Sequence, residues 1–133
     1  FQIYLKKNKI KSIPLKVSAP FHCSLMKPAA EVMRDKINKI KFNKPELEII
    51  SNVTANSTQD TLDIKKLLID QIFSTVRWRE SIINMSKAGI TNFIEIGPGK
   101  ALTGMVKRTI KNANCFSINS NDDIKNLNNE FKR

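Results

Sequence analysis

His22 is the single histidine of this chain, and imidazole is the side chain best suited to carry protons near neutral pH. It lies in the segment Ser18-Ala19-Pro20-Phe21-His22-Cys23-Ser24-Leu25-Met26, where Pro20 ends an extended stretch and a helical pattern begins. Backbone on both sides therefore fixes its position. We expect His22 to be a candidate for acid–base chemistry, although a lone histidine is more often a packed or solvent-facing residue.

A second candidate is the glycine turn Gly97-Pro98-Gly99, which stands between an expected strand and an expected helix. Amides at the start of a helix attract anions, so the turn invites a phosphate-binding interpretation. However, its spacing matches neither the dinucleotide fingerprint nor the phosphate loop, and Pro98 has no amide hydrogen to donate. A tight, rigid turn is the better prediction.

The elements that would position these residues alternate between strand and helix. We expect a helix end at 2–7, a strand at 12–17, a helix at 24–41, a strand at 47–51, turns at 52–57, a helix capped by Asp60 or Thr61, a helix from Trp78 that stops at Gly89, a strand at 91–96, a helix at 100–111, a strand at 115–118 and a terminal helix from Asp122. This order predicts an α/β fold with a mainly parallel sheet and helices on its faces.

Length and composition narrow the class of protein. With 133 residues the chain is one domain at most, yet large enough to bury a core. Its apolar runs are far shorter than the roughly 20 residues of a transmembrane helix. The N-terminus carries neither an initiator Met nor a signal peptide, so we expect further sequence before Phe1. Cys23 and Cys115 lack paired spacing, and we expect no disulfide framework, no metal site and a reducing cytoplasm.

The net charge of +11 is compatible with an acidic partner, a nucleic acid or a phosphate-bearing substrate. The lysines are spread along the chain without the interleaved aromatic residues of a single-strand binder. Lysine, isoleucine and asparagine are all abundant, which a codon bias toward A and T would also produce. The charge alone therefore does not decide between a functional and a compositional origin.

Four segments in register resemble the C-terminal part of malonyl-CoA:acyl carrier protein transacylases. They are Val17-Ser18-Ala19-Pro20-Phe21-His22-Cys23-Ser24-Leu25-Met26-Lys27-Pro28-Ala29, Ile50-Ser51-Asn52-Val53-Thr54-Ala55, Gln71 followed by Val76-Arg77-Trp78, and Glu95-Ile96-Gly97-Pro98-Gly99-Lys100-Ala101-Leu102-Thr103-Gly104. Their order, spacing and residue identities all agree with that family, and together they cover essentially the whole chain.

The resemblance implies an α/β-hydrolase-like large subdomain with a small ferredoxin-like insert. Residues 1–17 would be the end of the ferredoxin-like subdomain, and residues 18–133 the C-terminal part of the large subdomain. It also implies a cytoplasmic enzyme of fatty acid biosynthesis, or one of an organellar matrix, with malonyl-CoA and acyl carrier protein as substrates. No further cofactor, nucleic acid or membrane partner is implied.

In this family a serine takes malonyl from coenzyme A as an ester and passes it to the phosphopantetheine thiol of the carrier protein. The resemblance assigns His22 as the catalytic base and acid. It assigns Gln71 as the residue whose main-chain carbonyl orients the imidazole, so its side chain matters less. Phe21 would line the acyl site, where a ring before the histidine accompanies malonyl use, or it would only pack; both interpretations stay open.

The sequence also departs from the family in an informative way. It contains no Gly-x-Ser-x-Gly elbow, so the nucleophile must come from an N-terminal portion of the enzyme that is absent here. We therefore expect the chain alone to be inactive and that portion to be a partner. Ser74, Thr75 and Arg77 also differ from the usual residues before Trp78. The alternatives are a non-catalytic basic binding module with the same fold and an acyltransferase fragment of a polyketide synthase.

Overall fold

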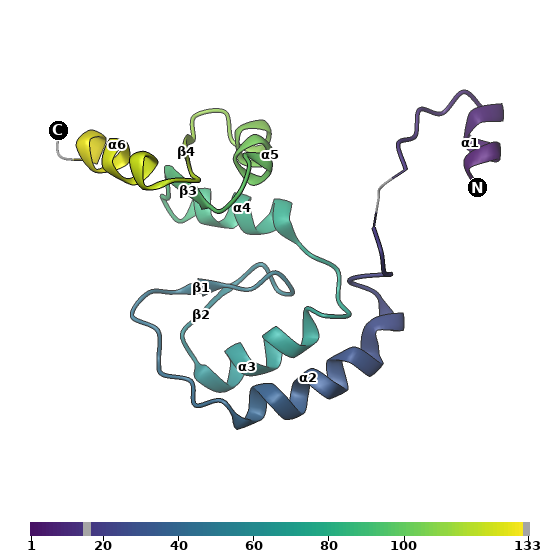
Figure 1. The fold of residues 1–133 in the computed structure, drawn as a ribbon, viewed down its shortest axis with the longest axis horizontal. Helices are drawn as coiled ribbons and strands as arrows, with labels where there is room; N and C mark the ends of the chain where they lie inside the picture. The colour runs from purple at the N-terminus through teal and green to yellow at the C-terminus, as the bar shows by residue number, and fades with distance from the viewer. Residues whose placement is uncertain (15–16, 132–133) are drawn as a thin grey trace.

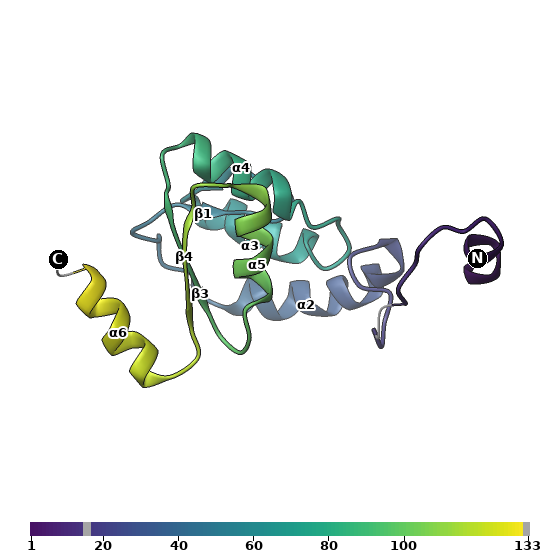
Figure 2. The same ribbon diagram turned by 90° about the horizontal axis from the view of Figure 1, so that it is seen from above.

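The computed structural model describes residues 1–14 and 17–131. In it an N-terminal arm, residues 1–14 and 17–20, leads into two groups of packed elements (Figure 1). Helix α1 (Gln2–Lys7) confirms the expected helix end and stands apart from the remaining elements (Figures 1 and 2). The strand expected at 12–17 is wrong for residues 12–14 and 17, which adopt no strand, and its residues 15–16 lie outside the described residues. A strand needs a neighbouring strand to bond with, and none of the described strands pairs with this segment.

The first group is built on two helices, α2 (Lys27–Lys39) and α3 (Thr61–Asp70). A short 3-10 helix, η1 (Ser24–Met26), leads into α2. The carboxylate of Asp60 accepts hydrogen bonds from the amides of Leu62 and Asp63, at 2.9 and 2.8 Å, and so confirms the expected cap of α3. The helices enclose a small core, which consists of Ala30, Ile37 and Ile69 with Phe42, Ile72 and Phe73 packed around them.

A hairpin of two short strands completes this group. Strand β1 (Ile49–Ile50) pairs with β2 (Ser57–Thr58) in the antiparallel direction. Part of the expected 47–51 strand is thus present, but its partner was not expected. The connecting loop, residues 51–56, is far too short for the crossover of a dozen or more residues that parallel pairing requires. The described strands thus form a mixed α/β arrangement with two small sheets, of which this one is antiparallel, and the mainly parallel sheet expected from the sequence stays a prediction.

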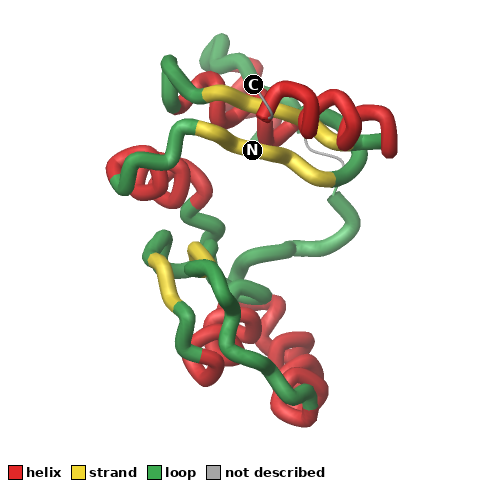
Figure 3. The backbone as a smooth tube through the Cα atoms, turned by 90° about the vertical axis from the view of Figure 1, so that its left-hand side faces the viewer, coloured by secondary structure: helices red, strands yellow, loops and turns green. Residues whose placement is uncertain are grey.

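The second group follows the expected order closely. It consists of α4 (Trp78–Lys87), β3 (Asn92–Ile96), α5 (Ala101–Thr109), β4 (Asn114–Ile118) and α6 (Asn121–Phe131). Gly89, with φ of +90°, ends α4 as expected. Strands β3 and β4 run parallel in register from Asn92 opposite Asn114 to Ile96 opposite Ile118. Figure 3 shows the two strands side by side with helices around them.

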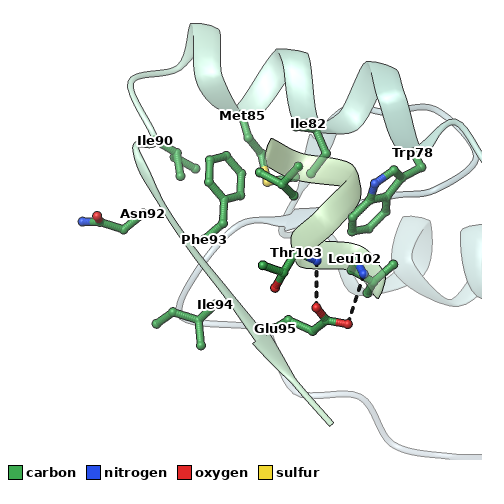
Figure 4. A pocket seen from close by; sticks show the side chains of 11 residues that line it. Trp78, Ile82, Met85, Ile90, Asn92, Phe93, Ile94, Glu95, Leu102 and Thr103 are labelled. Atoms are coloured by element: carbon green, nitrogen blue, oxygen red, sulfur yellow. Dashed lines mark hydrogen bonds between the residues drawn. The ribbon is translucent and has the colours of Figure 1, made fainter. Parts of the chain in front are cut away.

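Glu95 fixes the turn between β3 and α5. Its carboxylate accepts hydrogen bonds from the amides of Thr103 at 2.7 Å and Leu102 at 3.1 Å (Figure 4). These bonds, above all the one from the amide of Thr103, lower the pKa of Glu95. Gly97 and Gly99 adopt φ of +133° and +93°, which favours glycine over residues with a side chain. Two of the amides at the start of α5 thus bond to the chain's own carboxylate.

Many large apolar side chains of the chain are exposed, including those of Phe1, Ile3, Leu47 and Ile96. In contrast, the fully buried positions are few and small, and Ile82 is the largest of them. Exposed apolar surface of this extent is typical of an interaction face. Among residues 1–14 and 17–131, no helix has the length and apolar character needed to cross a membrane.

Candidate active site

The backbone holds His22 in an unusual conformation. Its φ is +59°, in the left-handed region that few residues other than glycine adopt, although asparagine, aspartate and histidine are enriched there. Hydrogen bonds on either side stabilise the turn: the amide of Phe21 donates to the carbonyl of Ala19 at 2.9 Å, and the thiol of Cys23 donates to the carbonyl of Pro20 at 3.1 Å. A non-glycine residue in this region is a recurrent feature of functional sites.

The imidazole of His22 reaches across to the end of α3. Its Nδ1 lies 2.8 Å from the main-chain oxygen of Gln71, a residue 49 positions later in the chain. A carbonyl oxygen only accepts, so Nδ1 must carry the hydrogen of this bond. In the neutral ring the lone pair is then on Nε2, which is the nitrogen free to take a proton. The expected contact between His22 and the Gln71 carbonyl is present.

Gln71 lies at the position that caps the C-terminus of α3, with φ of −66° and ψ of −19°. Its amide donates to the carbonyl of Leu67 at 3.0 Å, so the residue continues the helix while its own carbonyl is left for His22. Its side-chain oxygen accepts a longer bond from the side-chain amide of Asn52 at 3.4 Å. The side chain of Gln71 therefore faces the loop 51–56, while its main chain faces the histidine.

The loop 51–56 is held by α4 as well as by its own hairpin. The amide of Arg77 donates to the carbonyl of Asn52 at 2.8 Å, and its guanidinium donates to the carbonyl of Thr54 at 3.1 Å. Asn84 adds a bond from its side-chain amide to the carbonyl of Ala55 at 2.9 Å. Ala55 is buried with φ of +59°. Helix α4 thus supports the loop whose Asn52 contacts Gln71.

Three residues that support this loop, Asn52, Arg77 and Asn84, carry no predicted role from the sequence. Asn52 lies in one of the four segments that carry the family resemblance, which was the available signal. Arg77 departs from the family pattern in sequence, yet in the structure it bonds to the loop through its amide and its guanidinium. Asn84 gave no signal, because a single asparagine on a helix has many interpretations.

Phe21 and His22 are neighbours at the surface, and Phe21 does not pack into a core of this chain, since its side chain is 55% exposed. Within the described residues, the ring of His22 makes one hydrogen bond, to Gln71, and no serine is hydrogen-bonded to it. The site therefore contains an imidazole whose Nδ1 is oriented by the Gln71 carbonyl. No cluster of three or more potential metal ligands occurs in the described part of the chain.

Comparisons with known proteins give close relatives. A malonyl CoA-acyl carrier protein transacylase of Bacillus subtilis is 41% identical over 114 residues, which make up 86% of this chain and 36% of the relative. The crystal structure of malonyl CoA-acyl carrier protein transacylase from Clostridium perfringens matches with a TM-score of 0.86 at 36% identity, covering 98% of this chain and 41% of that chain.

A third match is a complex described as a type II PKS acyl-carrier protein with its malonyl-transacylase. It has a TM-score of 0.81 at 35% identity and covers 88% of this chain and 38% of that chain. No family model matches the chain.

Sequence and fold together make this chain a homologue of acyltransferases. More narrowly, it is homologous to malonyl-CoA:acyl carrier protein transacylase. The chain spans between 36% and 41% of the length of the relatives named above.

Proposed function

We propose that the chain is the C-terminal part of a malonyl-CoA:acyl carrier protein transacylase, in which His22 is the general base and acid for a serine supplied by the N-terminal portion. The observation that carries this proposal is the 2.8 Å contact between His22 Nδ1 and the Gln71 carbonyl. That contact leaves Nε2 as the proton-accepting nitrogen. It joins two segments that resemble the family's catalytic segments.

Each half-reaction would use the imidazole twice. Nε2 takes the proton of the serine hydroxyl while the serine oxygen attacks the malonyl thioester carbon. When the carbon–sulfur bond breaks, Nε2 returns that proton to the departing coenzyme A thiolate, and malonyl remains as a serine ester. The phosphopantetheine thiol then gives its proton to Nε2 and attacks the ester, and the serine oxygen leaves with the proton.

The chain's exposed apolar surface supports an N-terminal portion as partner. In this proposal residues 1–17 are the end of a ferredoxin-like small subdomain. Residues 18–133 are the C-terminal part of an α/β-hydrolase-like large subdomain. The position of α1, at the end of the arm and apart from both groups, is compatible with a boundary in this region (Figure 2).

Malonyl-CoA and acyl carrier protein are the proposed substrates. The complex of a homologous malonyl-transacylase with an acyl-carrier protein supports the carrier protein as partner. The net charge of +11 would favour the encounter with an acidic carrier, and this effect should weaken as salt rises. Since that complex contains a carrier protein of polyketide synthesis, a polyketide carrier is the second candidate partner.

Reconstitution tests the proposal. The chain is mixed with the portion of the Bacillus subtilis relative that precedes the matched segment, and transfer of labelled malonyl from coenzyme A to acyl carrier protein is measured. We expect transfer by the pair and none by either part alone. Transfer by this chain alone would contradict the assignment of the nucleophile to the other portion. A stable pair without transfer would favour the non-catalytic binding module.

Phe21 is proposed to line the acyl site. Replacing it with serine should open space for an α-methyl group and raise the ratio of methylmalonyl to malonyl transfer by the reconstituted pair about 10-fold, within the 1 to 3 kcal/mol that one methyl group is worth in a pocket. Competition between the two labelled thioesters measures this ratio directly, and Phe21→Leu, which keeps apolar bulk, is the matched control. An unchanged ratio in Phe21→Ser would assign the ring to packing alone.

A further inference from the structure

One residue of the loop 51–56 holds both ends of the connection between α3 and α4. The side-chain amide of Asn52 donates to the side-chain oxygen of Gln71 at 3.4 Å, and the main-chain carbonyl of Asn52 accepts from the amide of Arg77 at 2.8 Å. Gln71 begins this connection and Arg77 ends it. Because the carbonyl of Gln71 also accepts from His22, a displacement of Asn52 changes the position of the acceptor on which the imidazole depends.

The guanidinium of Arg77 fixes the same loop at a second point. It donates to the carbonyl of Thr54 at 3.1 Å, while the main-chain amide of Arg77 holds Asn52. Inside the loop, the amide of Ala55 donates to the carbonyl of Ser51 at 2.8 Å. This bond closes the turn, so Asn52 and Thr54 are constrained to move together. A hydrogen bond with a charged donor is stronger than a neutral one, so the guanidinium is a strong side-chain tie between α4 and the loop.

An ion pair on the surface does not explain the position of Arg77. Its Nε lies 3.6 Å from a carboxylate oxygen of Glu80, and both side chains are half-exposed. Exposed ion pairs contribute little, because water screens them and because ordering two long side chains costs entropy. The carbonyl of Thr54, in contrast, belongs to a turn whose main chain is already fixed. The two contacts of this side chain are separate, so each can be tested without the other.

We propose that Arg77 is a positioning residue for His22. It holds the loop through Thr54, the loop holds Gln71 through Asn52, and the Gln71 carbonyl accepts from Nδ1 of the imidazole. The inference rests on the proposed function and adds a residue that acts through other residues. Without the guanidinium, the Gln71 carbonyl should occupy a wider range of positions. The neutral ring would then carry its hydrogen on Nδ1, with Nε2 free to accept a proton, for a smaller fraction of the time.

A loss of orientation should affect the proton transfers more than the binding of substrate. In the proposed mechanism Nε2 exchanges protons with the serine hydroxyl and the thiols, so its misplacement slows those steps. An interaction that matters only during the reaction lowers kcat and leaves KM unchanged. We therefore expect Arg77→Ala to lower the kcat of the reconstituted pair about 3- to 10-fold, the effect of one hydrogen bond, with the KM for malonyl-CoA within about 2-fold of the parent value.

Two further variants show which contact of Arg77 matters. Glu80→Gln is the matched control, because it removes the ion pair and leaves the bond to Thr54, so kcat should stay within about 2-fold of the parent value. Arg77→Lys keeps the positive charge but offers one ammonium in place of a fork, so its kcat should lie between those of Arg77→Ala and the parent chain. An equal loss in Glu80→Gln and Arg77→Ala would assign the effect to the ion pair and overturn the inference.

The nitrogen-15 signals of His22, the single histidine, test the coupling in the chain alone. We expect Arg77→Ala to lower the ratio of the neutral ring form with hydrogen on Nδ1 to the form with hydrogen on Nε2 about 2- to 5-fold, while the Nδ1 form still predominates. Glu80→Gln should leave this ratio unchanged. A residue that only stabilises the fold would change urea unfolding without changing the ratio, so an unchanged ratio in folded Arg77→Ala would overturn the inference.

Asn52→Ala approaches the same coupling from the other end, and it decides the matter should Arg77→Ala not fold. It removes the bond to Gln71 and retains the main-chain carbonyl that accepts from Arg77. We expect the ratio of ring forms to fall as in Arg77→Ala, and to fall no further in the double variant, because both changes break one chain of contacts. Fully additive effects, or an unchanged ratio in Asn52→Ala, would mean that Arg77 does not act through Asn52 and would overturn the inference.

The inference and the proposed function fail separately. Ring forms that respond to Arg77→Ala, in a chain whose reconstituted pair transfers no malonyl, would reject the function and retain the positioning contact. Transfer with the same kcat in Arg77→Ala as in the parent pair would reject the positioning role and retain the function. A rise in KM with unchanged kcat would make Arg77 a substrate-binding residue instead and overturn the inference.

Discussion

Replacing His22 with asparagine is expected to lower malonyl transfer by the reconstituted pair about 10²- to 10⁴-fold, the range that positioned acid–base groups contribute. Asparagine is the better replacement because it tolerates the φ of +59° at this position. Alanine would add backbone strain of about 1 to 2 kcal/mol and so confuse loss of the base with loss of the turn. Initial rates of labelled transfer, with binding of the two parts checked independently, measure the effect.

Gln71→Ala is the matched comparison, and its effect should stay below about 10-fold. The variant retains the main-chain carbonyl that contacts His22 and removes only the side-chain bond from Asn52 at 3.4 Å. A neutral hydrogen bond contributes roughly 0.5 to 1.5 kcal/mol net, which sets this limit. If Gln71→Ala were as damaging as His22→Asn, the side chain rather than the carbonyl would be the functional group. Activity of His22→Asn above a tenth of the parent level would remove His22 from the mechanism.

A spectroscopic measurement checks the geometry without catalysis. When only this chain carries nitrogen-15, its single histidine gives one pair of ring nitrogen signals. Because Nδ1 donates to the Gln71 carbonyl, we expect the neutral ring to carry its hydrogen on Nδ1. The same tautomer is expected in Gln71→Ala, since the carbonyl remains. A neutral ring with hydrogen on Nε2 would contradict the orientation on which the proposed mechanism depends.

Sequence patterns predicted the second group of elements well because glycines mark where its helices and strands end. Gly89 ends α4, and Gly97 and Gly99 turn the chain between β3 and α5, so the expected bounds of these elements agree with the structure to within a few residues. In each case the residue that ends the element lies within or directly after that element, so the sequence alone indicates the bound. The parallel pairing of β3 with β4 then follows from the helix that connects them.

The errors lie where structure depends on distant partners. The alternating pattern of residues 12–17 is typical of a strand, but a strand forms only beside another one. The hairpin of β1 and β2 was missed because Ser57–Thr58 is too short and too polar to stand out in a sequence. The burial of a side chain also depends on distant residues. Ile94 and Ile96 are apolar residues of a type usually found in a core, yet both are exposed in this chain.

In the candidate site, too, local features were predictable from the sequence and long-range contacts were not. Position and residue type made His22 a candidate, but only the family resemblance connected it with Gln71, because no local pattern links residues 49 positions apart. The hydrogen bonds that hold the loop beside the site could not be predicted from the sequence for a similar reason. Arg77 and Asn84 donate hydrogen bonds to main-chain carbonyls of the loop 51–56. Because every residue has a main-chain carbonyl, the residue type does not indicate which carbonyl accepts such a bond.

Ile82→Ala is expected to reduce the free energy of unfolding of the chain by about 2 to 5 kcal/mol, the usual cost of emptying a buried isoleucine site. Ile82 is 1% exposed, and among the described residues it is the largest side chain that is completely buried. Small domains are stable by only about 5 to 15 kcal/mol, so this loss is a large share of the total. Urea unfolding followed by circular dichroism and by the emission of Trp78, one turn earlier in α4, measures it.

Ile96→Ala is the control, because it removes the same atoms from a side chain that is 81% exposed. Its cost should stay below about 1 kcal/mol, the range of strand propensities. The contrast tests whether the second group has a packed interior of its own. Equal losses for the two variants would mean that α4 does not pack firmly on α5 and β3 in the chain alone. Folding of this group and binding of the N-terminal portion would then be a single step.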